Sequence, residues 1–173
     1  MRDIGFDFYW TDVHAQDLLA RGFEYDPSIG QIDLLTCFET FEHLVNPLPE
    51  IEKMLHISRE ILLLTILLPS PLPSTGKWNY FGLSHGQHVS FYTKHTLEFI
   101  ARRYGLNFYT DGESIHLFTS KTFRKNLLTK LSAASSGKRF ERIRRRMKSR
   151  TSEDSLMMAE LRSREAGETG THH

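Results

Sequence analysis

The pattern of apolar and polar positions predicts alternating strands and helices over the first part of the chain. Two nearly continuous apolar runs, residues 32–39 and 59–69, are typical of strands buried on both faces of a parallel sheet. The aromatic-rich run 6–12 predicts a shorter strand. Residues 14–23 and 46–58 carry apolar side chains at helical spacing. The resulting order, β-α-β-α-β, favours a parallel α/β sheet with right-handed crossovers.

A long loop, a helix and a hairpin are predicted to follow. Residues 70–91 are rich in Gly, Pro and aromatic residues, and a loop of this length in a compact domain indicates either a functional role or disorder. Its aromatic clusters favour the functional role. Residues 93–105 have an amphipathic helical pattern that opens with a threonine and ends with a glycine. Residues 106–121 form two alternating runs around an Asp-Gly pair, which indicates an antiparallel hairpin.

Charge divides the chain into two parts. The formal net charge is only +1, but residues 121–173 hold 14 Lys and Arg against 6 Asp and Glu, which gives +8 and leaves −7 for residues 1–120. We therefore predict a domain over residues 1–121 and a basic tail, helical or disordered, over residues 122–173. The tail is either a solvated segment that aids solubility or a binding site for nucleic acid or anionic membrane.

Cysteine content and hydropathy narrow the class of protein. The single cysteine excludes an internal disulfide framework and a Cys-rich zinc module, and it favours a reducing compartment, so we expect a cytoplasmic location. The most apolar stretch, which starts at Ile61, stays uncharged for about a dozen residues, short of the roughly 20 that a spanning helix needs. We interpret it as a buried strand.

Polar residues gather where the first long apolar run ends. Cys37, Glu39, Glu42 and His43 follow one another there, and open α/β sheets bind their ligands at the carboxyl ends of strands. The two carboxylates could also be solvated loop residues. His43 could be a structural hydrogen-bonding group or a base, because imidazole exchanges protons near neutrality.

Two short motifs in this order carry a family resemblance. The segments E-T-F-E-H-L at residues 39–44 and H-V-S-F-Y-T at residues 88–93 resemble those of class I S-adenosylmethionine-dependent methyltransferases. The similarity covers residues 1–121 and is greatest to the small-molecule branch that includes the ubiquinone-biosynthesis type. It implies a Rossmann-like, mostly parallel sheet with a C-terminal antiparallel hairpin, and methyl transfer from S-adenosylmethionine to a small molecule such as a sugar, lipid precursor or quinone precursor.

The resemblance also implies roles for individual residues. An acidic side chain at the end of the second family strand accepts hydrogen bonds from the ribose hydroxyls of the cofactor, which points to Asp12 with its neighbour Val13. The end of the fourth family strand meets the methionine part, which points to Cys37, Phe38 and Glu39. On the acceptor side, the expected catalytic residues are His43 and His88, and the expected substrate-binding residues are Trp78, Tyr80 and His85. The aromatic residues among them could equally belong to the core.

One family feature is missing, and it leaves a second function open. The chain has no glycine-rich loop of the form E/D-x-G-x-G-x-G, so it resembles a methyltransferase that lacks the first strand and this loop. We expect an incomplete sheet whose exposed edge favours self-association. The alternative function is a non-catalytic remnant that binds nucleic acid or membrane through the basic tail. The pair His85-x-x-His88 lacks a fixed third ligand, so we expect no metal site there.

Overall fold

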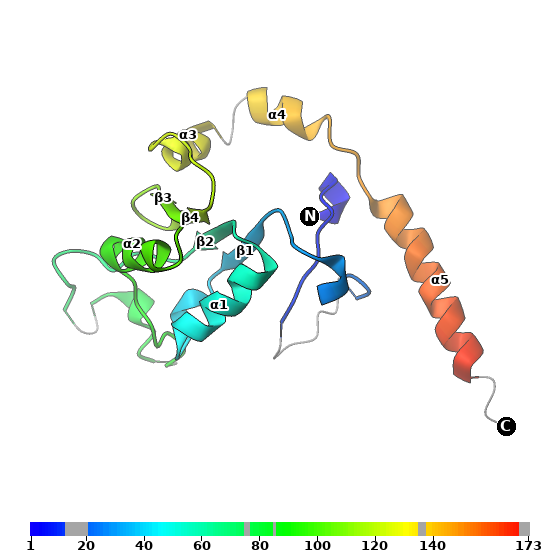
Figure 1. Ribbon diagram of the computed structural model, residues 1–173, viewed down its shortest axis with the longest axis horizontal. Coiled ribbons are helices and arrows are strands. Elements are labelled where there is room, and N and C mark those ends of the chain that lie inside the picture. The colour runs from blue at the N-terminus through cyan, green and yellow to red at the C-terminus, as the bar shows by residue number, and fades with distance from the viewer. Residues whose placement is uncertain (13–20, 75–76, 85, 135–137, 170–173) are drawn as a thin grey trace. The chain divides into compact units, whose positions relative to one another are not determined.

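The computed structural model (Figure 1) describes residues 1–12, 21–74, 77–84, 86–134 and 138–169. The chain divides into two compact units. The sheet unit spans Pro27–Ser135. The terminal unit combines Met1–Asp26 with Ser136–His173.

The sheet unit holds a four-stranded sheet in the order β1-β2-β4-β3. Strands β1 and β2 pair in parallel, and β4 is antiparallel to both of its neighbours, β2 and β3. The mixed α/β architecture that we predicted is therefore present, but the parallel pairing is confined to β1 and β2, since the other two strands form the predicted hairpin. The strands are β1 (Leu35–Phe38), β2 (Ile61–Leu64), β3 (Asn107–Thr110) and β4 (Ile115–Thr119).

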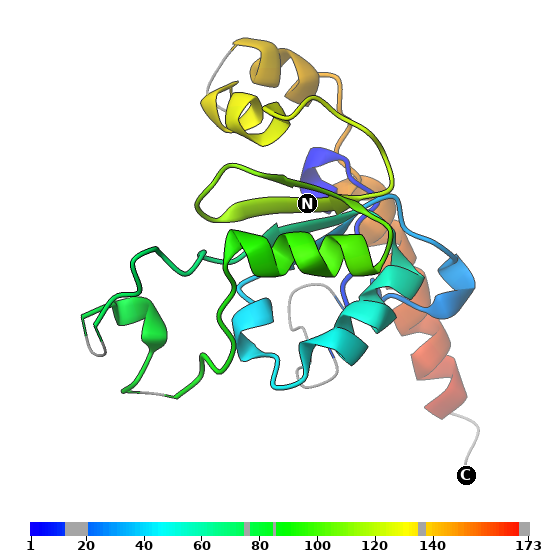
Figure 2. The ribbon, with the colours of Figure 1, turned by 60° about the vertical axis from the view of Figure 1, so that its left-hand side comes forward.

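Helices cover both faces of this sheet. Helices α1 and α2 lie on one face, and α3 lies over the other, beside β3 (Figure 2). Thr93 caps α2, because its side chain accepts a hydrogen bond of 3.1 Å from the backbone N–H of Thr96. Leu128 of α3 is buried, so the sheet unit continues past Lys121. The helices are α1 (Pro47–Ile57), α2 (Lys94–Arg103) and α3 (Leu127–Ala134).

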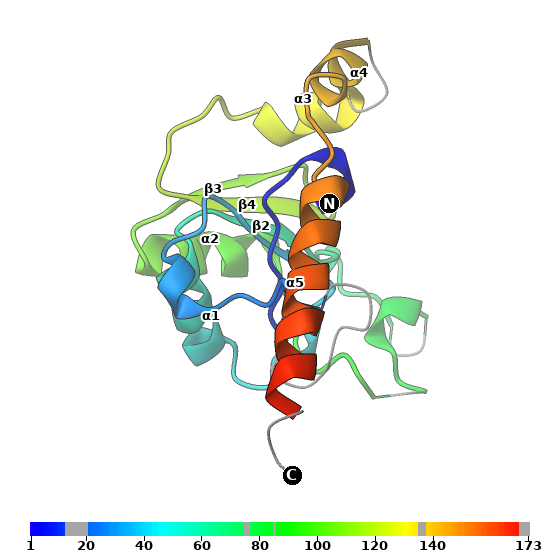
Figure 3. The ribbon, with the colours of Figure 1, turned by 90° about the vertical axis from the view of Figure 1, so that its right-hand side faces the viewer.

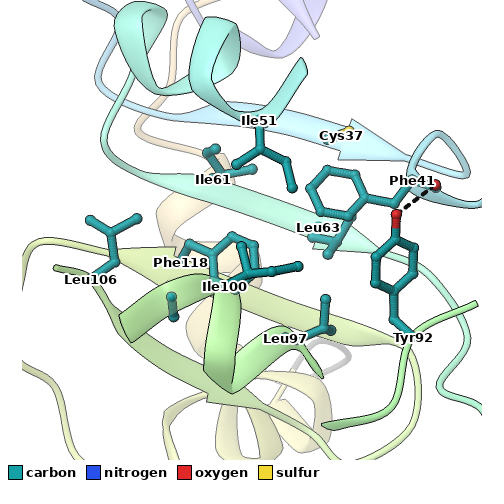
Figure 4. Close-up of a cluster of buried hydrophobic side chains, with 11 residues drawn as sticks. Cys37, Phe41, Ile51, Ile61, Leu63, Tyr92, Leu97, Ile100, Leu106 and Phe118 are labelled. Carbon is teal, nitrogen blue, oxygen red and sulfur yellow. Dashed lines mark hydrogen bonds between the residues drawn. The ribbon is translucent and has the colours of Figure 1, made fainter. Parts of the chain in front are cut away.

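The core lies between the sheet and helices α1 and α2 (Figure 4). Ile61 and Leu63 alternate along β2 toward this core, as the period-2 geometry of a strand requires. Phe41, which follows β1, is fully buried, and its carbonyl accepts a 3.1 Å hydrogen bond from the Tyr92 hydroxyl. This bond ties the segment after β1 to the segment before α2, and both segments carry candidate functional residues.

In the terminal unit, the N-terminal segment packs beside helix α5, Thr151–Thr169 (Figure 3). The Arg2 guanidinium donates hydrogen bonds to both carboxylate oxygens of Asp154 and to one of Asp7, and it lies over the Phe23 ring at 4.1 Å. The strand predicted at residues 6–12 is wrong.

Only Trp10 in that run pairs, in a single parallel bridge with Glu24. A strand needs a partner strand along its length, and the sequence pattern alone could not show whether one is present. Most of the helix predicted at 14–23 lies outside the described residues.

The remaining elements are the short helix α4 and several 3₁₀ turns. Helix α4, Lys138–Arg144, begins a basic segment, residues 138–150, in which the side chains of Arg142, Arg144, Arg145 and Arg146 are exposed. Within the described ranges, no helix is both long and apolar enough to cross a bilayer. The 3₁₀ turns are η1 (Arg2–Ile4), η2 (Pro27–Ile29), η3 (Phe41–His43) and η4 (Asn79–Phe81).

Candidate active site

Glu39, directly after β1, has an unusual backbone conformation. Its φ of 49° lies in the left-handed region, which non-glycine residues seldom adopt. Its backbone N–H still donates to the carbonyl of Leu64 at 2.9 Å, so the turn starts where the parallel pairing stops. Its side chain is exposed at the carboxyl end of the strand. Strained residues of this kind cluster at functional sites, so this end of the sheet is a candidate functional site.

Glu42 is a fully buried carboxylate three residues later. Its Oε1 accepts a 2.7 Å hydrogen bond from the Tyr80 hydroxyl, and its Oε2 accepts one of 3.1 Å from the Thr65 hydroxyl. The Tyr80 hydroxyl is also within 3.2 Å of Thr65 Oγ1 and accepts the backbone N–H of Ile66 at 3.2 Å. A buried charge is tolerated only when it is hydrogen-bonded in this manner.

The two motifs noted in the sequence are joined through the backbone. The carbonyl of Glu42 accepts hydrogen bonds from the N–H groups of Val89, at 2.8 Å, and Ser90, at 3.0 Å. The Ser90 hydroxyl donates to the carbonyl of Leu44. Because these bonds join Val89 and Ser90 to Glu42 and Leu44, they fix the register between the segment after β1 and the loop before α2. His43 and His88 are brought together as a result.

The rings of His43 and His88 meet edge to face with 5.0 Å between their centroids. His43 Nδ1 lies 2.8 Å from the carbonyl oxygen of Gln87, and His88 Nδ1 lies 2.5 Å from that of Tyr80. A carbonyl oxygen can only accept, so in each ring Nδ1 carries the proton and donates it. In the neutral imidazole, the lone pair is then on Nε2.

The two carboxylates of the site have opposite pKa shifts. Partial desolvation of its carboxyl group and a hydrogen bond with Glu42 raise the pKa of Glu39. Burial also opposes ionisation of Glu42, but hydrogen bonds from its own backbone N–H and from Tyr80, Glu39 and Thr65 hold its pKa below the usual value. Burial raises the pKa of Tyr80 to about 12, so it remains a hydroxyl donor. Glu42 is therefore the ionised partner, and Glu39 holds a proton more readily.

A second buried histidine supports Thr65 from the other side. His116 of β4 donates from Nε2 to the carbonyl of Thr65 at 3.0 Å, and its Nδ1 accepts from the Thr110 hydroxyl at 2.7 Å. Burial lowers the pKa of His116, which favours the neutral ring that these two bonds require. The position of Thr65 is thus fixed both at its side chain and at its backbone.

An open pocket of about 760 Å³ begins one residue after Thr65. Ile66 links it to the polar site, because the Ile66 N–H donates to Tyr80. Trp78, one of the expected substrate-binding residues, lines this pocket. Pockets with apolar walls and a few polar groups are typical of small-molecule sites. The other lining residues include Leu67, Leu68, Leu72, Thr93, Lys94 and Glu113.

The predicted cofactor-binding residues have different surroundings. The side chain of Cys37 lies in the core, where burial raises the pKa of its thiol to about 11, so only its backbone is available to a ligand. Phe38 and Glu39 are exposed. Asp12 belongs to the terminal unit and is exposed, while Val13 lies outside the described residues, and their roles stay predictions.

On the acceptor side, His43, His88 and Tyr80 lie in one cluster, but Tyr80 uses its hydroxyl to hold Glu42. His85 lies outside the described residues. Thr65 was missed from the sequence, although it is the only polar residue between Ile61 and Leu68, which was the available signal. No local pattern distinguished the buried Glu42 from a solvated carboxylate.

A mixed α/β sheet with its polar site at the carboxyl ends of a parallel strand pair is the arrangement of ligand-binding Rossmann-like domains. Residues 1–110 match the family described as a methyltransferase domain, and the chain belongs to this family. No curated protein and no solved structure matches the chain.

Proposed function

We propose that the protein transfers a methyl group from S-adenosylmethionine to a small-molecule acceptor at the carboxyl ends of β1 and β2. The observation that carries this proposal is the strained, exposed Glu39 beside the buried Glu42 and the paired imidazoles, in a chain of the methyltransferase domain family. The resemblance to the ubiquinone-biosynthesis branch supports a small-molecule acceptor.

The reaction requires alignment more than it requires chemistry from the protein. The acceptor nucleophile attacks the methyl carbon, the carbon–sulfur bond breaks, and sulfur keeps the electron pair, which leaves S-adenosylhomocysteine and one proton to be removed from the acceptor. Phe38 and Glu39 would contact the methionine part of the donor, and Asp12 would hold its ribose. His43 and His88 would face the acceptor, and an Nε2 lone pair can accept its hydrogen bond or its proton.

The pocket beside Thr65 is the proposed acceptor site. Its apolar wall from Ile66 to Leu72 and the ring of Trp78 suit an acceptor with a substantial apolar surface. Lys94 and His95, at the start of α2, offer the polar groups that would orient such a molecule. This composition favours a lipid or quinone precursor over a free sugar.

Calorimetric titration of S-adenosylhomocysteine into the full chain tests the donor assignment. We expect saturable one-site binding that weakens at least about tenfold in Glu39→Ala, since a lost charge-assisted hydrogen bond costs about 1.5–3 kcal/mol. Glu52→Ala, an exposed carboxylate on α1, is the matched control and should bind as the unaltered chain does. Absence of binding, or equal binding by Glu39→Ala, would reject the donor site.

The basic segment supports a second candidate function, binding to a polyanion such as nucleic acid. Its exposed arginines are four residues within a stretch of five, Arg142, Arg144, Arg145 and Arg146. Neutralising several phosphates releases counterions, so binding should weaken steeply with salt.

Anisotropy of a labelled single-stranded RNA, measured at two salt concentrations, tests this candidate. Replacing the four arginines with glutamine should remove the binding. A segment that only aids solubility would give no salt-sensitive binding, and anionic vesicles tested alongside would reveal a membrane partner instead.

A further inference from the structure

Three potential metal ligands meet in the sheet unit. One donor atom from each of Glu42, His43 and His88 lies within 4.8 Å of the donor atoms of the other two. A cation placed about 2.0–2.2 Å from each ligand brings its ligands to within about 4.4 Å of one another, so small side-chain adjustments would complete the site. Glu42 and His88 are 46 positions apart in the sequence, which is why no spacing motif predicted the set.

The orientation of both imidazoles matches that of metal ligands. Metal-binding histidines nearly always donate their other ring N–H to a carbonyl or carboxylate, which fixes the tautomer and the direction of the ring. Here the Nδ1–H of His43 is held by Gln87 and that of His88 by Tyr80, in both cases by a backbone carbonyl. Each hydrogen bond therefore assigns the ligand role to Nε2.

The carboxylate is positioned in the same manner. Glu42 is fully buried, and each of its oxygens accepts one hydroxyl, from Tyr80 and from Thr65. Carboxylates that bind metals are themselves held by hydrogen bonds, which fix the direction in which they face the cation. Tyr80 holds two of the three ligands, Glu42 through its hydroxyl and His88 through its carbonyl, which couples them in one rigid arrangement.

We propose that Glu42, His43 and His88 form a binding site for a divalent transition-metal cation of the zinc type. Two imidazole nitrogens and one carboxylate are the ligand set of catalytic zinc sites, and they suit zinc and its neighbours better than magnesium or calcium, which prefer oxygen. Glu39, beside Glu42, is a further carboxylate at the same site. Because His43 is exposed, the cation has a route of entry and retains a coordination position open to solvent.

The functional role that we assign to this metal site rests on the proposed methyl transfer. A bound cation would hold an acceptor hydroxyl next to the donor and lower the pKa of that hydroxyl, as metals do for bound water. The acceptor class is then one with a hydroxyl, or two adjacent hydroxyls, that can coordinate a metal. Metal binding itself needs neither donor nor acceptor, so the two proposals can be tested separately.

The test is titration of Co²⁺ into the full chain, followed by its visible absorption, which reports ligand geometry. We expect one equivalent to bind with the spectrum of a four- or five-coordinate nitrogen and oxygen site, and Zn²⁺ to displace it. His43→Ala, at an exposed position, should weaken binding at least about tenfold without unfolding the domain. His56→Ala removes an exposed histidine of α1 and should leave the spectrum and affinity unchanged.

A second variant guards against nonspecific histidine binding. Tyr80→Phe keeps all three ligands but removes the hydroxyl that orients Glu42, and we expect about a 10- to 100-fold loss of affinity. The proposal is overturned by absent Co²⁺ binding, by an unchanged spectrum in His43→Ala, or by equal losses in His43→Ala and His56→Ala. If Co²⁺ binds but S-adenosylhomocysteine does not, the metal site stands and the methyl-donor assignment fails. If S-adenosylhomocysteine binds but Co²⁺ does not, the metal-site proposal fails and the methyl-donor assignment stands.

Discussion

Tyr80 and Glu42, 38 residues apart in the sequence, are joined by a 2.7 Å hydrogen bond from the tyrosine hydroxyl to Oε1 of a fully buried carboxylate. The same hydroxyl accepts the N–H of Ile66, two residues after the end of β2. The loop that carries His88 is therefore fixed to the sheet by a charged group in the interior. Loss of this one hydroxyl would affect both the stability of the domain and the position of the histidines.

Tyr80→Phe should lower the free energy of unfolding by about 1.5–3 kcal/mol, because the buried Glu42 carboxylate loses one of the hydrogen bonds that stabilise its charge. Tyr104→Phe is the matched control, since the Tyr104 hydroxyl bonds to Glu52 in an exposed position and its loss should cost less than about 1 kcal/mol. Urea unfolding followed by circular dichroism measures both. Equal losses in the two variants would contradict a special role for the Tyr80–Glu42 bond.

The backbone at Glu39 predicts an unusual order of stabilities. At φ 49° a residue with a Cβ is strained by about 1–2 kcal/mol, whereas glycine is not. Glu39→Gly and Glu39→Ala remove the same carboxylate, so their difference isolates this strain. We expect the glycine variant to be more stable than the alanine variant by about 1 kcal/mol, by thermal or urea unfolding. An alanine variant as stable as the glycine variant would indicate that the turn relaxes out of the left-handed region.

The sequence predicted those parts of the fold that depend on local patterns. The apolar runs gave β1 and β2, the amphipathic pattern gave α2 with its threonine cap, and the Asp-Gly pair gave the hairpin of β3 and β4. It failed at residues 6–12, where aromatic content favoured a strand but only Trp10 has a pairing partner. Propensity does not reveal whether a partner strand exists.

The site was predicted residue by residue but not as an arrangement. The motifs identified His43 and His88, but their meeting depends on hydrogen bonds from Val89 and Ser90 to the carbonyl of Glu42, which no spacing reveals. The burial of Glu42 depends on Thr65 and Tyr80, each from a different segment. Tertiary contacts thus decide which of the polar residues after β1 are solvated and which are fixed.

His116 predicts a loss of stability in mild acid. Burial lowers its pKa in the folded protein, so below the unfolded value of about 6.5 the unfolded chain binds the proton more readily. Stability should therefore fall as the pH decreases through about 6.5, with a slope that approaches about 1.4 kcal/mol per pH unit. Urea unfolding between about pH 7.5 and pH 5.5 measures this slope.

The control is His116→Gln, which does not titrate in this range and should show a shallower slope than the unaltered chain. His56→Ala, at an exposed site on α1, should keep the full slope. A slope unchanged in His116→Gln would assign the acid sensitivity to another group.

Asp111 at the turn between β3 and β4 predicts a second, more acidic transition. Its Oδ1 accepts the backbone N–H groups of Glu113, Ser114 and Ile115 at 2.9–3.0 Å. Burial works against ionisation, but these three bonds hold the pKa of Asp111 below its usual value. Its stabilising contribution is therefore present above the unfolded value of about 3.9 and is lost as the pH falls through the lower folded value.

Asp111→Ala should cost about 1–2 kcal/mol near neutral pH, as loss of a comparable side-chain cap does. Asp111→Asn keeps an acceptor oxygen but not the charge, so it should be less destabilised than Asp111→Ala near neutral pH and should not titrate below about pH 4. Urea unfolding at about pH 7 and about pH 3.5 separates the two contributions, because only the ionised carboxylate adds a pH-dependent part. An Asn variant as unstable as the Ala variant at both values would show that charge, and not the turn's hydrogen bonds, holds the hairpin closed.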